Sequence, residues 1–358
     1  MRSQSEQIQD VLTQRPTDAL KVIGADDVQS LLGGREKEIM ETVRKAYASH
    51  ATAQSSLPHS SFLRFPGQPR NRIIALPAYL GDPFNVAGIK WIASFPGNHD
   101  AGLDRASAVI VLNSTETGRP EVLLEGSLIS AKRTAASAAL AAQYLHPNPD
   151  VDTVGLIGCG LINFEIARFL LFTFSKLRRF VLFDNSQQNA ELFRSRCRNL
   201  FGPVEVDIVA ASEHVFRMAT LVSFATTASE PHVERIDDAL EATTVLHVSL
   251  RDLSPALILR YDNVVDDIDH VCRAQTSLDL ARQSSGHADF IRGTLGEIIL
   301  GKIAARNPSS NITIFSPFGL GILDLALSKF VVDAAREPGL GFEVPSFLPQ
   351  SWGSAKAL

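Results

Sequence analysis

The sequence contains little cysteine and no long apolar run. Its three cysteines, Cys159, Cys197 and Cys272, are widely spaced and form no CxxC pair. This spacing argues against a disulfide framework or a structural zinc site and fits a reducing compartment. No run of 18 apolar residues occurs, and the polar segment 1–21 lacks the apolar centre of a secretory signal. We therefore expect a soluble cytoplasmic protein with no membrane partner and no metal.

The sequence also lacks an excess of positive charge. Its 358 residues include 34 Lys and Arg against 39 Asp and Glu, a net charge of −5. Without a general positive field, a small molecule is a better expected partner than nucleic acid. The content of 45% apolar and 20% charged residues is typical of a globular protein. Because a chain of 358 residues is longer than a single hydrophobic core usually supports, we expect two domains.

The first part of the chain combines helical and antiparallel β patterns. Apolar spacing over residues 26–50 predicts one surface helix. Residues 60–124 contain short β-type runs between Gly, Pro and Asn turns, which predicts an antiparallel sheet with strands near 72–76, 87–93 and 108–112. An Ala-rich helix is predicted from Ser130 to Leu145, ended by His146-Pro-Asn-Pro149.

From residue 151 onward, strand-like runs alternate with helical ones. This alternation is typical of a parallel sheet with crossover helices. The expected strands are 153–157, 179–183, 219–224, 244–248 and 263–265, with one helix near 161–176. After Phe330 the chain becomes polar and proline-rich, and we expect it to return to the first domain.

A glycine-containing loop follows the first of these strands. Gly158 and Gly160 lie between strand and helix, and Asp184 closes the next strand. The glycines allow a pyrophosphate to approach the helix N-terminus, and the carboxylate can accept hydrogen bonds from ribose hydroxyls while repelling a 2′-phosphate. The loop therefore predicts NAD binding, with a turn that binds no ligand as the alternative. Asn163 replaces the usual Gly or Ala and is expected to loosen the packing of helix on strand.

Five cations in or beside the β-rich part are candidates for binding an anion: Arg64, Arg72, Lys90, Arg105 and Arg133. Solvated surface charge is the ordinary explanation for any single arginine. Lys90 differs because it lies in an apolar run, where a charged group needs a partner such as a bound carboxylate. Arg133 is expected near a helix N-terminus, where an anion would offset the unfavourable dipole.

Asp252 follows a predicted strand of the parallel sheet, at the edge where such folds bind ligands. It is our candidate general acid and base. The equally weighted alternative is a turn or helix-capping aspartate before Ser254-Pro255. His247, within the strand, is interpreted as a core histidine with its hydrogen bonds satisfied.

Several segments resemble the ornithine cyclodeaminase/μ-crystallin family. They are Asn71-Arg-Ile-Ile-Ala-Leu-Pro77, Ala87-Gly-Ile-Lys-Trp-Ile92, Arg105-Ala-Ser-Ala-Val-Ile-Val-Leu-Asn113, Glu125-Gly-Ser-Leu-Ile-Ser130, Arg133-Thr-Ala-Ala136 and Leu156-Ile-Gly-Cys-Gly-Leu-Ile162. The segments around Lys90 and Arg133 mark the broad family. The Gly-Ile-Lys-Trp-Ile, Arg-Ala-Ser-Ala and Gly-Ser-Leu-Ile-Ser strings are most similar to one subgroup, the N-((2S)-2-amino-2-carboxyethyl)-L-glutamate dehydrogenases of 2,3-diaminopropionate biosynthesis.

The resemblance implies an α/β fold in which a Rossmann NAD-binding domain, residues 134–320, is inserted into an α+β domain for substrate binding and dimerisation, residues 1–133 and 321–358. It implies a homodimer that acts on a small amino-acid substrate. It implies that Arg64, Lys90 and Arg133 bind the substrate carboxylate and that Asp252, with Lys90, is catalytic. The residues expected to contact NAD are Gly158, Gly160, Leu161, Ile162, Asp184, Thr226, Ser249, Leu250, Phe318 and Gly319.

Two departures from cyclodeaminases favour the subgroup. Arg105 replaces their threonine, and the segment ending in Arg251-Asp252 replaces their glycine-rich turn. Both add positive charge, which suits a substrate with three carboxylates and opposes ornithine. The expected reaction is NAD-dependent oxidative cleavage to 2-oxoglutarate and L-2,3-diaminopropionate, for which Asp252 needs a raised pKa. The alternatives are a cyclodeaminase, another amino-acid or ketimine dehydrogenase, and a non-catalytic crystallin-like nucleotide-binding protein.

Overall fold

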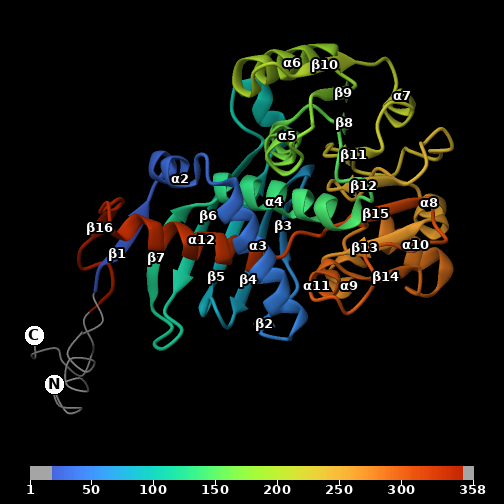
Figure 1. Ribbon diagram of the computed structural model, residues 1–358. Helices are drawn as coiled ribbons and strands as arrows, with labels where there is room; N and C mark the ends of the chain where they lie inside the picture. The colour runs from blue at the N-terminus through green and yellow to red at the C-terminus, as the bar shows by residue number, and fades with distance from the viewer. Residues whose placement is uncertain (1–17, 350–358) are drawn as a thin grey trace, which may run out of the picture.

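The computed structural model describes residues 18–349. Most of the polar N-terminal segment discussed above, and the last nine residues of the range assigned to the substrate-binding domain, lie outside the described residues. Two eight-stranded sheets form the scaffold, and helices pack against both (Figure 1). The predicted α/β class, with a parallel dinucleotide-binding sheet beside a second, mostly antiparallel sheet, is confirmed.

The first sheet contains strands from both ends of the described chain. Its order is β16-β1-β7-β6-β5-β4-β2, and β3 also pairs with β4. All pairs are antiparallel except β1 with β7, and the pairing of β16 with β1 confirms that the tail returns to the first part of the chain. The strands are β1 (Leu20–Ile23), β2 (Ser55–Ser56), β3 (Ser61–Phe65), β4 (Gln68–Leu80), β5 (Val86–Ser94), β6 (Ala106–Asn113), β7 (Pro120–Glu125) and β16 (Phe342–Val344).

The second sheet is parallel throughout, in the order β10-β9-β8-β11-β12-β15-β13-β14. Its first five strands follow the 3-2-1-4-5 order of a Rossmann fold, so the strand order reverses beside β8 and β11. Ligands of such sheets bind at this point, beyond the carboxyl ends of the strands. The strands are β8 (Thr153–Ile157), β9 (Arg179–Phe183), β10 (Glu205–Ile208), β11 (Leu221–Phe224), β12 (Thr243–His247), β13 (Asp262–Val265), β14 (Ile291–Thr294) and β15 (Ile312–Ser316).

The single surface helix predicted for residues 26–50 is wrong. Two helices replace it, because the Gly33-Gly34 pair interrupts the helix and Gly34 has a φ of 68°. The second helix is amphipathic, as the spacing predicted: Val43 and Tyr47 are fully buried, whereas Lys37, Glu38 and Lys45 are exposed. The helices are α2 (Ala25–Leu32), α3 (Glu36–Ala51), α4 (Ser127–Leu145), α5 (Leu161–Thr173), α6 (Gln187–Phe201), α7 (Ser212–Phe216), α8 (Pro255–Arg260), α9 (Ile268–Val271), α10 (Ser277–Ser285), α11 (Leu295–Ile299) and α12 (Gly321–Arg336), with a 3₁₀ turn at Pro96–Ala101.

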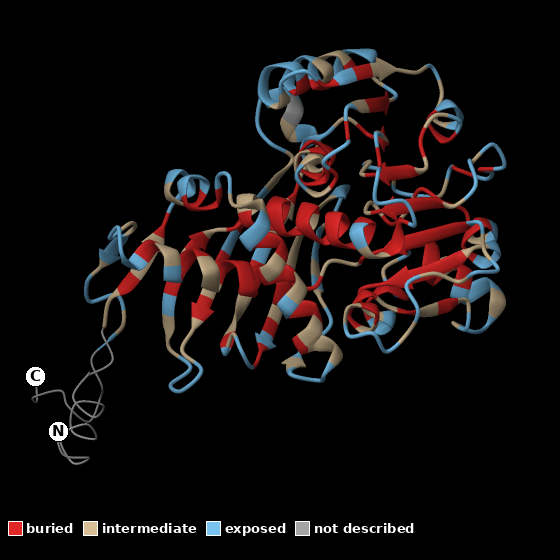
Figure 2. Cartoon of the chain, in the orientation of Figure 1, coloured by how far each residue is buried: buried red, intermediate tan, exposed pale blue. Residues whose placement is uncertain are grey.

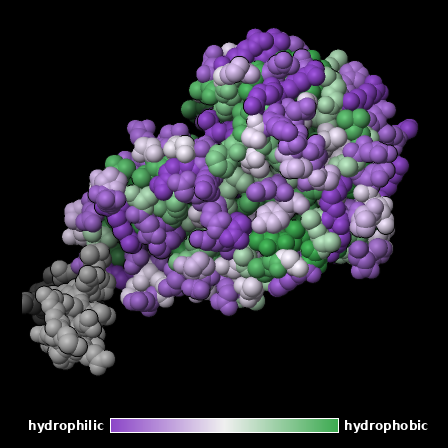
Figure 3. Space-filling model, in the orientation of Figure 1, coloured by the Kyte–Doolittle hydropathy of each residue, from purple (hydrophilic) through white to green (hydrophobic). Residues whose placement is uncertain are grey.

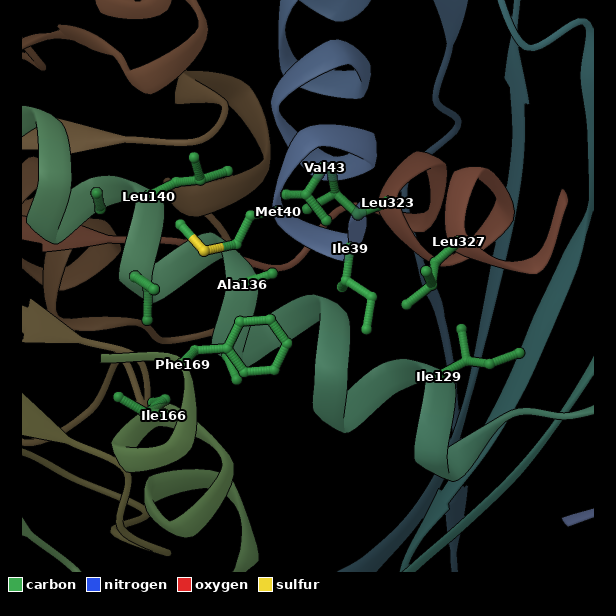
Figure 4. Close-up of a cluster of buried hydrophobic side chains, with 14 of the residues drawn as sticks. Ile39, Met40, Val43, Ile129, Ala136, Leu140, Ile166, Phe169, Leu323 and Leu327 are labelled. Carbon is green, nitrogen blue, oxygen red and sulfur yellow. The ribbon is translucent and has the colours of Figure 1, made fainter. Parts of the chain in front are cut away.

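Helix α4 joins the two sheets through one continuous core. Its small alanine side chains let α3, α5 and α12 approach closely, and the shared core includes Ala136, Leu140, Met40, Phe169 and Leu323 (Figure 4). Helices α4 and α12 are buried along most of their length (Figure 2), whereas the outer surface seen in Figure 3 is largely hydrophilic. Between residues 18 and 349, no helix is both long and apolar enough to cross a membrane.

Candidate active site

Lys90 and Arg133 share one buried carboxylate. Lys90, on β5, donates to Oδ2 of Asp324 at 2.6 Å and to the Ser130 hydroxyl at 3.1 Å. The Nε atom of Arg133, on α4, donates to Oδ1 of Asp324 at 3.0 Å. Lys90 is 1% exposed and Asp324 is fully buried. Burial lowers the pKa of Lys90 to about 8, and the positive charge of Arg133 acts in the same direction.

The structure differs from two sequence-based expectations about Lys90 and Arg133. A bound anion was expected to partner Lys90 and Arg133, but the chain supplies the carboxylate itself. Arg133 also does not begin its helix, because α4 starts at Ser127 and places Arg133 in the second turn. Asp324 was not among the predicted site residues, although an acidic residue within the apolar run Gly321-Ile-Leu-Asp-Leu-Ala-Leu327 is the same signal that singled out Lys90.

A second group of cations, which we call the arginine cluster, consists of Arg64, Arg72, Arg105 and Arg251. Arg64 and Arg72 are direct partners across β3 and β4, and Arg72 is paired with Ser94 of β5, which accepts a hydrogen bond from Arg105 at 2.7 Å. Burial lowers the pKa of Arg72, and the charges of Arg251, Arg105 and Arg64 lower it further. Each member therefore lies within electrostatic range of Arg72.

The arginine cluster contains no ion pair, although the negative charge of Asp252 acts on Arg251. Within residues 18–349, none of its members forms an ion pair, and the buried Nε atom of Arg72 has no hydrogen-bond partner. Arg64 is exposed, with its guanidinium 5.7 Å from the ring of Phe62. A set of like charges without a carboxylate partner can bind an anionic ligand.

Asp252 is fully buried beyond the end of β12. Its carboxylate accepts hydrogen bonds from the hydroxyls of Thr226 and Ser249, and Nε2 of His247 lies 3.3 Å from Oδ2. The cap of α8 is Ser254, so the capping alternative for Asp252 is wrong. His247 is a fully buried core histidine, as interpreted, and its Nδ1 lies 3.2 Å from the Ser316 hydroxyl.

The pKa of Asp252 departs from the value that its expected role requires. Burial alone would raise the pKa, but the neighbouring His247 ring and the hydrogen bonds from the Ser249 and Thr226 hydroxyls favour the ionised form and hold the pKa below the ordinary value. Asp252 is therefore a carboxylate at neutral pH. The lowered pKa makes it a weaker base than an ordinary aspartate, and once protonated it is a strong donor to an amine.

The glycine loop lies beyond β8, at the point where the strand order reverses. Gly158 has a φ of 91°, and a Cβ atom there would lie 2.6 Å from the carbonyl oxygen of Ala225. A Cβ atom on Gly160 would meet no protein atom within 4 Å, which leaves room for a ligand at the N-terminus of α5. Leu161 and Ile162 open that helix. This geometry fits a pyrophosphate bound to the orphan N–H groups of the first turn.

Asp184 lies directly after β9 and faces this loop. Its carboxylate accepts hydrogen bonds from the backbone N–H of Cys159 and of Ser186, both at 2.8 Å. It remains partly exposed and retains acceptor capacity for a ribose. The negative charge opposes a 2′-phosphate.

Asn163 does not loosen the loop as we expected. Its fully buried side-chain amide donates to the carbonyl oxygens of Ile157 and Gly158 at 2.9 and 2.7 Å, and its oxygen accepts from the Ser223 hydroxyl at 2.7 Å. Three hydrogen bonds thus replace the close contact that Gly or Ala would allow, and they join the loop to β11.

The remaining predicted cofactor residues also follow strand ends of the parallel sheet. Thr226 follows β11, Ser249 and Leu250 follow β12, and Phe318 and Gly319 follow β15. The buried carboxylate of Asp266 accepts hydrogen bonds from the N–H groups of Phe318 and Gly319, both at 2.8 Å.

Gly319 also connects this edge to the first group of cations. A Cβ atom on Gly319 would lie 3.0 Å from Nη1 of Arg133, so the guanidinium lies against the glycine backbone. The structure therefore brings the predicted cofactor turn next to Lys90, Arg133 and Asp324. Among residues 18–349, no group of three or more His, Cys, Asp or Glu side chains is arranged to hold a metal ion.

Comparison with known proteins agrees with the resemblance. The model of the ornithine cyclodeaminase/mu-crystallin family matches residues 24–339. The chain therefore belongs to this family, and its fold is that of the family.

Three relatives illustrate the range of activities. The N-((2S)-2-amino-2-carboxyethyl)-L-glutamate dehydrogenase of Staphylococcus aureus is 26% identical over 325 residues, which cover 89% of this chain and 96% of that protein. The structure of Thermococcus litoralis Delta(1)-pyrroline-2-carboxylate reductase in complex with NADH and L-proline has a TM-score of 0.84 and 25% identity, covering 91% of this chain and all of that one. An archaeal alanine dehydrogenase dimer with bound NAD has a TM-score of 0.81 and 26% identity, covering 91% and 99%.

Proposed function

We propose that the protein catalyses the NAD-dependent oxidative cleavage of N-((2S)-2-amino-2-carboxyethyl)-L-glutamate. Substrate, NAD⁺ and water give 2-oxoglutarate, L-2,3-diaminopropionate, NADH and a proton. The bond from nitrogen to the glutamate Cα is oxidised to an imine, which water then hydrolyses. The diaminopropionate serves siderophore or peptide-antibiotic biosynthesis in the cytoplasm.

The nucleotide is NAD rather than NADP. Gly158 and Gly160 accommodate the pyrophosphate at the N-terminus of α5, and Asp184 accepts the ribose hydroxyls. When bound, NAD⁺ supplies the hydride acceptor for oxidation of the substrate carbon. Phe318 and Gly319 complete the side of the site that adjoins Arg133.

The distribution of positive charge is the main observation that supports this substrate. Lys90 and Arg133 outnumber Asp324 and can bind one carboxylate, while the arginine cluster offers four further cations that form no ion pair. Lys90 and Ser94 share one face of β5 and are four residues apart, so the two groups of cations lie about 13 Å apart along this strand. A ligand with several separated carboxylates matches this spacing better than a simple amino acid does.

Asp252 moves the proton during hydrolysis of the imine. The ionised carboxylate accepts a proton from the attacking water and then donates it to the departing amine. Thr226, Ser249 and His247 hold the carboxylate in place. The backbone N–H of Asp252 also donates to Nε2 of His247 at 3.2 Å, which fixes the residue against β12.

Purified protein with NAD⁺ and each candidate substrate tests the proposal by NADH absorbance and product identification. N-((2S)-2-amino-2-carboxyethyl)-L-glutamate should give NADH, 2-oxoglutarate and diaminopropionate, and L-alanine and L-proline should react far more slowly. Ammonia and proline from L-ornithine without net NADH would show a cyclodeaminase and overturn the assignment.

Asp252→Asn distinguishes an enzyme from a protein that only binds nucleotide. General acid and base catalysis contributes about 10²-fold to 10⁴-fold, so kcat should fall by this factor. NADH affinity, measured by fluorescence titration, should stay within about twofold of wild type. Asp238→Asn removes an exposed aspartate of the same sheet domain and should leave both quantities unchanged. Equal loss of kcat in both variants would contradict the role of Asp252.

The outer face of the first sheet supports a homodimer. Side chains alternate between faces along a strand, so Trp91 points away from the buried Lys90 and from α12. Trp91 pairs with Val109 across β5 and β6, and both are 41% exposed. Leu63 and Tyr79, at 45% and 39% exposed, extend this apolar surface over β3 and β4. An apolar sheet face of this kind is typical of a subunit interface.

Light scattering on a sizing column tests the homodimer. The wild-type chain should elute at twice its mass of 38.9 kDa. Trp91→Glu places a charge in the apolar face and should shift the population to monomer, whereas Phe172→Glu, an exposed substitution on α5, should not. A monomeric wild-type protein would contradict this proposal and leave the proposed reaction standing.

A further inference from the structure

Helix α12 covers only part of one face of the first sheet. Along β4, Ala78 and Leu76 are buried on this face. The next two side chains on the same face, Ile74 and Arg72, are partly exposed. Helix α12 starts over the buried stretch, since a Cβ atom on Gly321 would lie 3.1 Å from the carbonyl oxygen of Leu76. The sheet face therefore continues past the start of the helix, where its side chains are accessible to a ligand.

This accessible part of the face contains a row of hydrocarbon side chains between two rows that carry cations. Paired residues of neighbouring antiparallel strands point to the same side, so the pairing defines the rows. One row contains Lys90, paired with Leu76, and another contains Arg72, paired with Arg64 and with Ser94. Between them lies a row that we call the apolar row: Phe62, Ile74, Ile92 and Ala108. Successive rows are about 6.6 Å apart, which is twice the rise per residue.

The far end of this face offers several hydrogen-bond donors to an anion. Arg105 reaches it from the start of β6, because its guanidinium donates to the buried hydroxyl of Ser94 at 2.7 Å. The guanidinium of Arg64 lies 5.7 Å from the ring of Phe62, which shows that an arginine of this row can reach back over the apolar row. The buried Nε atom of Arg72 has no hydrogen-bond partner.

The near end of the face adjoins the predicted cofactor turn. Lys90 shares Asp324 with Arg133, and the guanidinium of Arg133 lies against the backbone of Gly319. The carbon that is oxidised must lie beside the cofactor, so the carboxylate on that carbon belongs at this end. A substituent of the same carbon can then extend over the apolar row.

The chemistry of the two arms of the substrate decides which one lies on this face. The glutamate arm consists of two methylenes followed by a carboxylate. The departing arm carries an ammonium group beside its carboxylate, and the arginine cluster would repel that group. The order of cation, hydrocarbon and cation on the sheet therefore matches the glutamate arm.

We propose that Arg72 and Arg105 bind the distal carboxylate of the glutamate arm, whose methylenes lie against Ile74 and Ile92. This assignment rests on the proposed function and defines the substrate class more closely. An amino-acid arm without a terminal carboxylate would leave the guanidinium groups desolvated and without a partner. The face therefore selects arms that begin with hydrocarbon and end in a carboxylate.

Two oxo acids test the role of the arginines without turnover. 2-Oxopentanoate has a methyl group in place of the distal carboxylate of 2-oxoglutarate. Calorimetry on the NADH complex should show about 10-fold to 100-fold tighter binding of 2-oxoglutarate, the range of a charged hydrogen bond. Arg105→Met should remove most of this preference and leave the affinity for 2-oxopentanoate within about twofold. Arg198→Met removes the same charge from an exposed site on α6 and should preserve the preference.

A substitution in the apolar row tests the contact with the methylenes. Ile92→Thr replaces a hydrocarbon branch by a hydroxyl and should weaken both oxo acids by a similar factor, about threefold to tenfold. Ile89→Thr makes the same change on the opposite face of β5 and should change neither affinity. An effect of Ile89→Thr equal to that of Ile92→Thr would contradict the placement of the methylenes.

A substrate analogue gives a kinetic measurement of the same preference. N-((2S)-2-amino-2-carboxyethyl)-L-norvaline has a methyl group in place of the distal carboxylate, and wild type should use it with about 10-fold to 100-fold lower kcat/KM. Arg105→Met should bring the ratio of the two substrates close to one. Arg105→Lys should restore part of the ratio, because it keeps the charge without the planar fork.

The outcomes distinguish this inference from the proposed function. Wild type that binds the two oxo acids equally overturns the inference and leaves the reaction standing, and this measurement needs no variant. Wild type that makes no NADH from the full substrate but prefers 2-oxoglutarate overturns the reaction and supports the site for the distal carboxylate. A folded Arg105→Met that keeps the wild-type preference overturns the role of Arg105.

Discussion

The two groups of cations differ in what neutralises them. Lys90 and Arg133 are buried against Asp324, whose carboxylate accepts hydrogen bonds from both. The arginine cluster forms no ion pair among residues 18–349, and the buried Nε of Arg72 has no hydrogen-bond partner. The first group is thus largely satisfied by the chain itself, and the second is left for a ligand to satisfy.

Because of this difference, we expect the paired group to contribute mainly to stability and the arginine cluster mainly to ligand binding. An internally paired group holds its geometry before substrate arrives, at the cost of desolvating three charges. A group of unpaired like charges stores repulsion that an anionic ligand relieves, so its energy appears in binding. Substitutions that alter one group at a time should therefore change the unfolding free energy more in the buried group than in the arginine cluster.

Replacing Asp324 by Asn should have the largest effect on folding. The substitution leaves Lys90 and Arg133 buried without their carboxylate, which typically costs about 3–5 kcal/mol of unfolding free energy. Urea denaturation monitored by circular dichroism measures the change. Asp333→Asn on the same helix removes an exposed partner of Lys329 and should cost less than about 1 kcal/mol. Similar costs for the two variants would contradict the view that Asp324 stabilises the buried cations.

The charge of Lys90 should control the pH dependence of product binding. With a pKa of about 8, Lys90 is mostly protonated at pH 7 and mostly neutral at pH 9. The inhibition constant of 2-oxoglutarate should therefore rise about tenfold over this interval, since deprotonation removes the attraction for its carboxylate. The ligand itself does not titrate there. NADH affinity, which does not involve Lys90, should stay constant, and a flat inhibition constant would show that Lys90 keeps its charge.

Much of the fold was predictable because local patterns and global architecture agree. Alternating strands and helices, and the loop from Gly158 to Asp184, predicted the parallel sheet and its ligand edge. The break between α2 and α3 was missed because apolar spacing continues across Gly33-Gly34, and only the left-handed φ of Gly34 interrupts the helix. Helical periodicity showed one apolar face of α3, but could not show that this face lies against α4 and α12.

The site was predictable as a set of residue types but not as a set of partners. Lys90 and Arg133 were identified by position, whereas Asp324 joins them from a helix 191 residues beyond Arg133. The downward shift of the Asp252 pKa depends on Thr226 and His247, which only the fold brings within hydrogen-bond reach. The effect of Asn163 was also mispredicted, because it stabilises the loop through hydrogen bonds with Gly158 and Ser223 that only the folded structure shows.

Replacing Arg72 by Met should have the smallest effect on folding. It tests whether the arginine cluster contributes to ligand binding and not to stability. Arg72 has no carboxylate to lose, and its removal relieves repulsion from Arg64, Arg105 and Arg251, while Met keeps the apolar stem. The unfolding free energy should therefore stay within about 0.5 kcal/mol of wild type or rise.

Arg292→Met is the matched control for Arg72→Met. Arg292 donates to the buried carboxylate of Asp262 at 2.7 Å, so the same substitution there should cost about 3 kcal/mol by leaving that carboxylate without its cation. Urea denaturation measures the unfolding free energy of both variants. If Arg72→Met were as costly as Arg292→Met, the arginine cluster would be part of the folded framework. A stable Arg72→Met with weakened substrate binding is expected instead, because the counterion that satisfies the cluster is then the substrate.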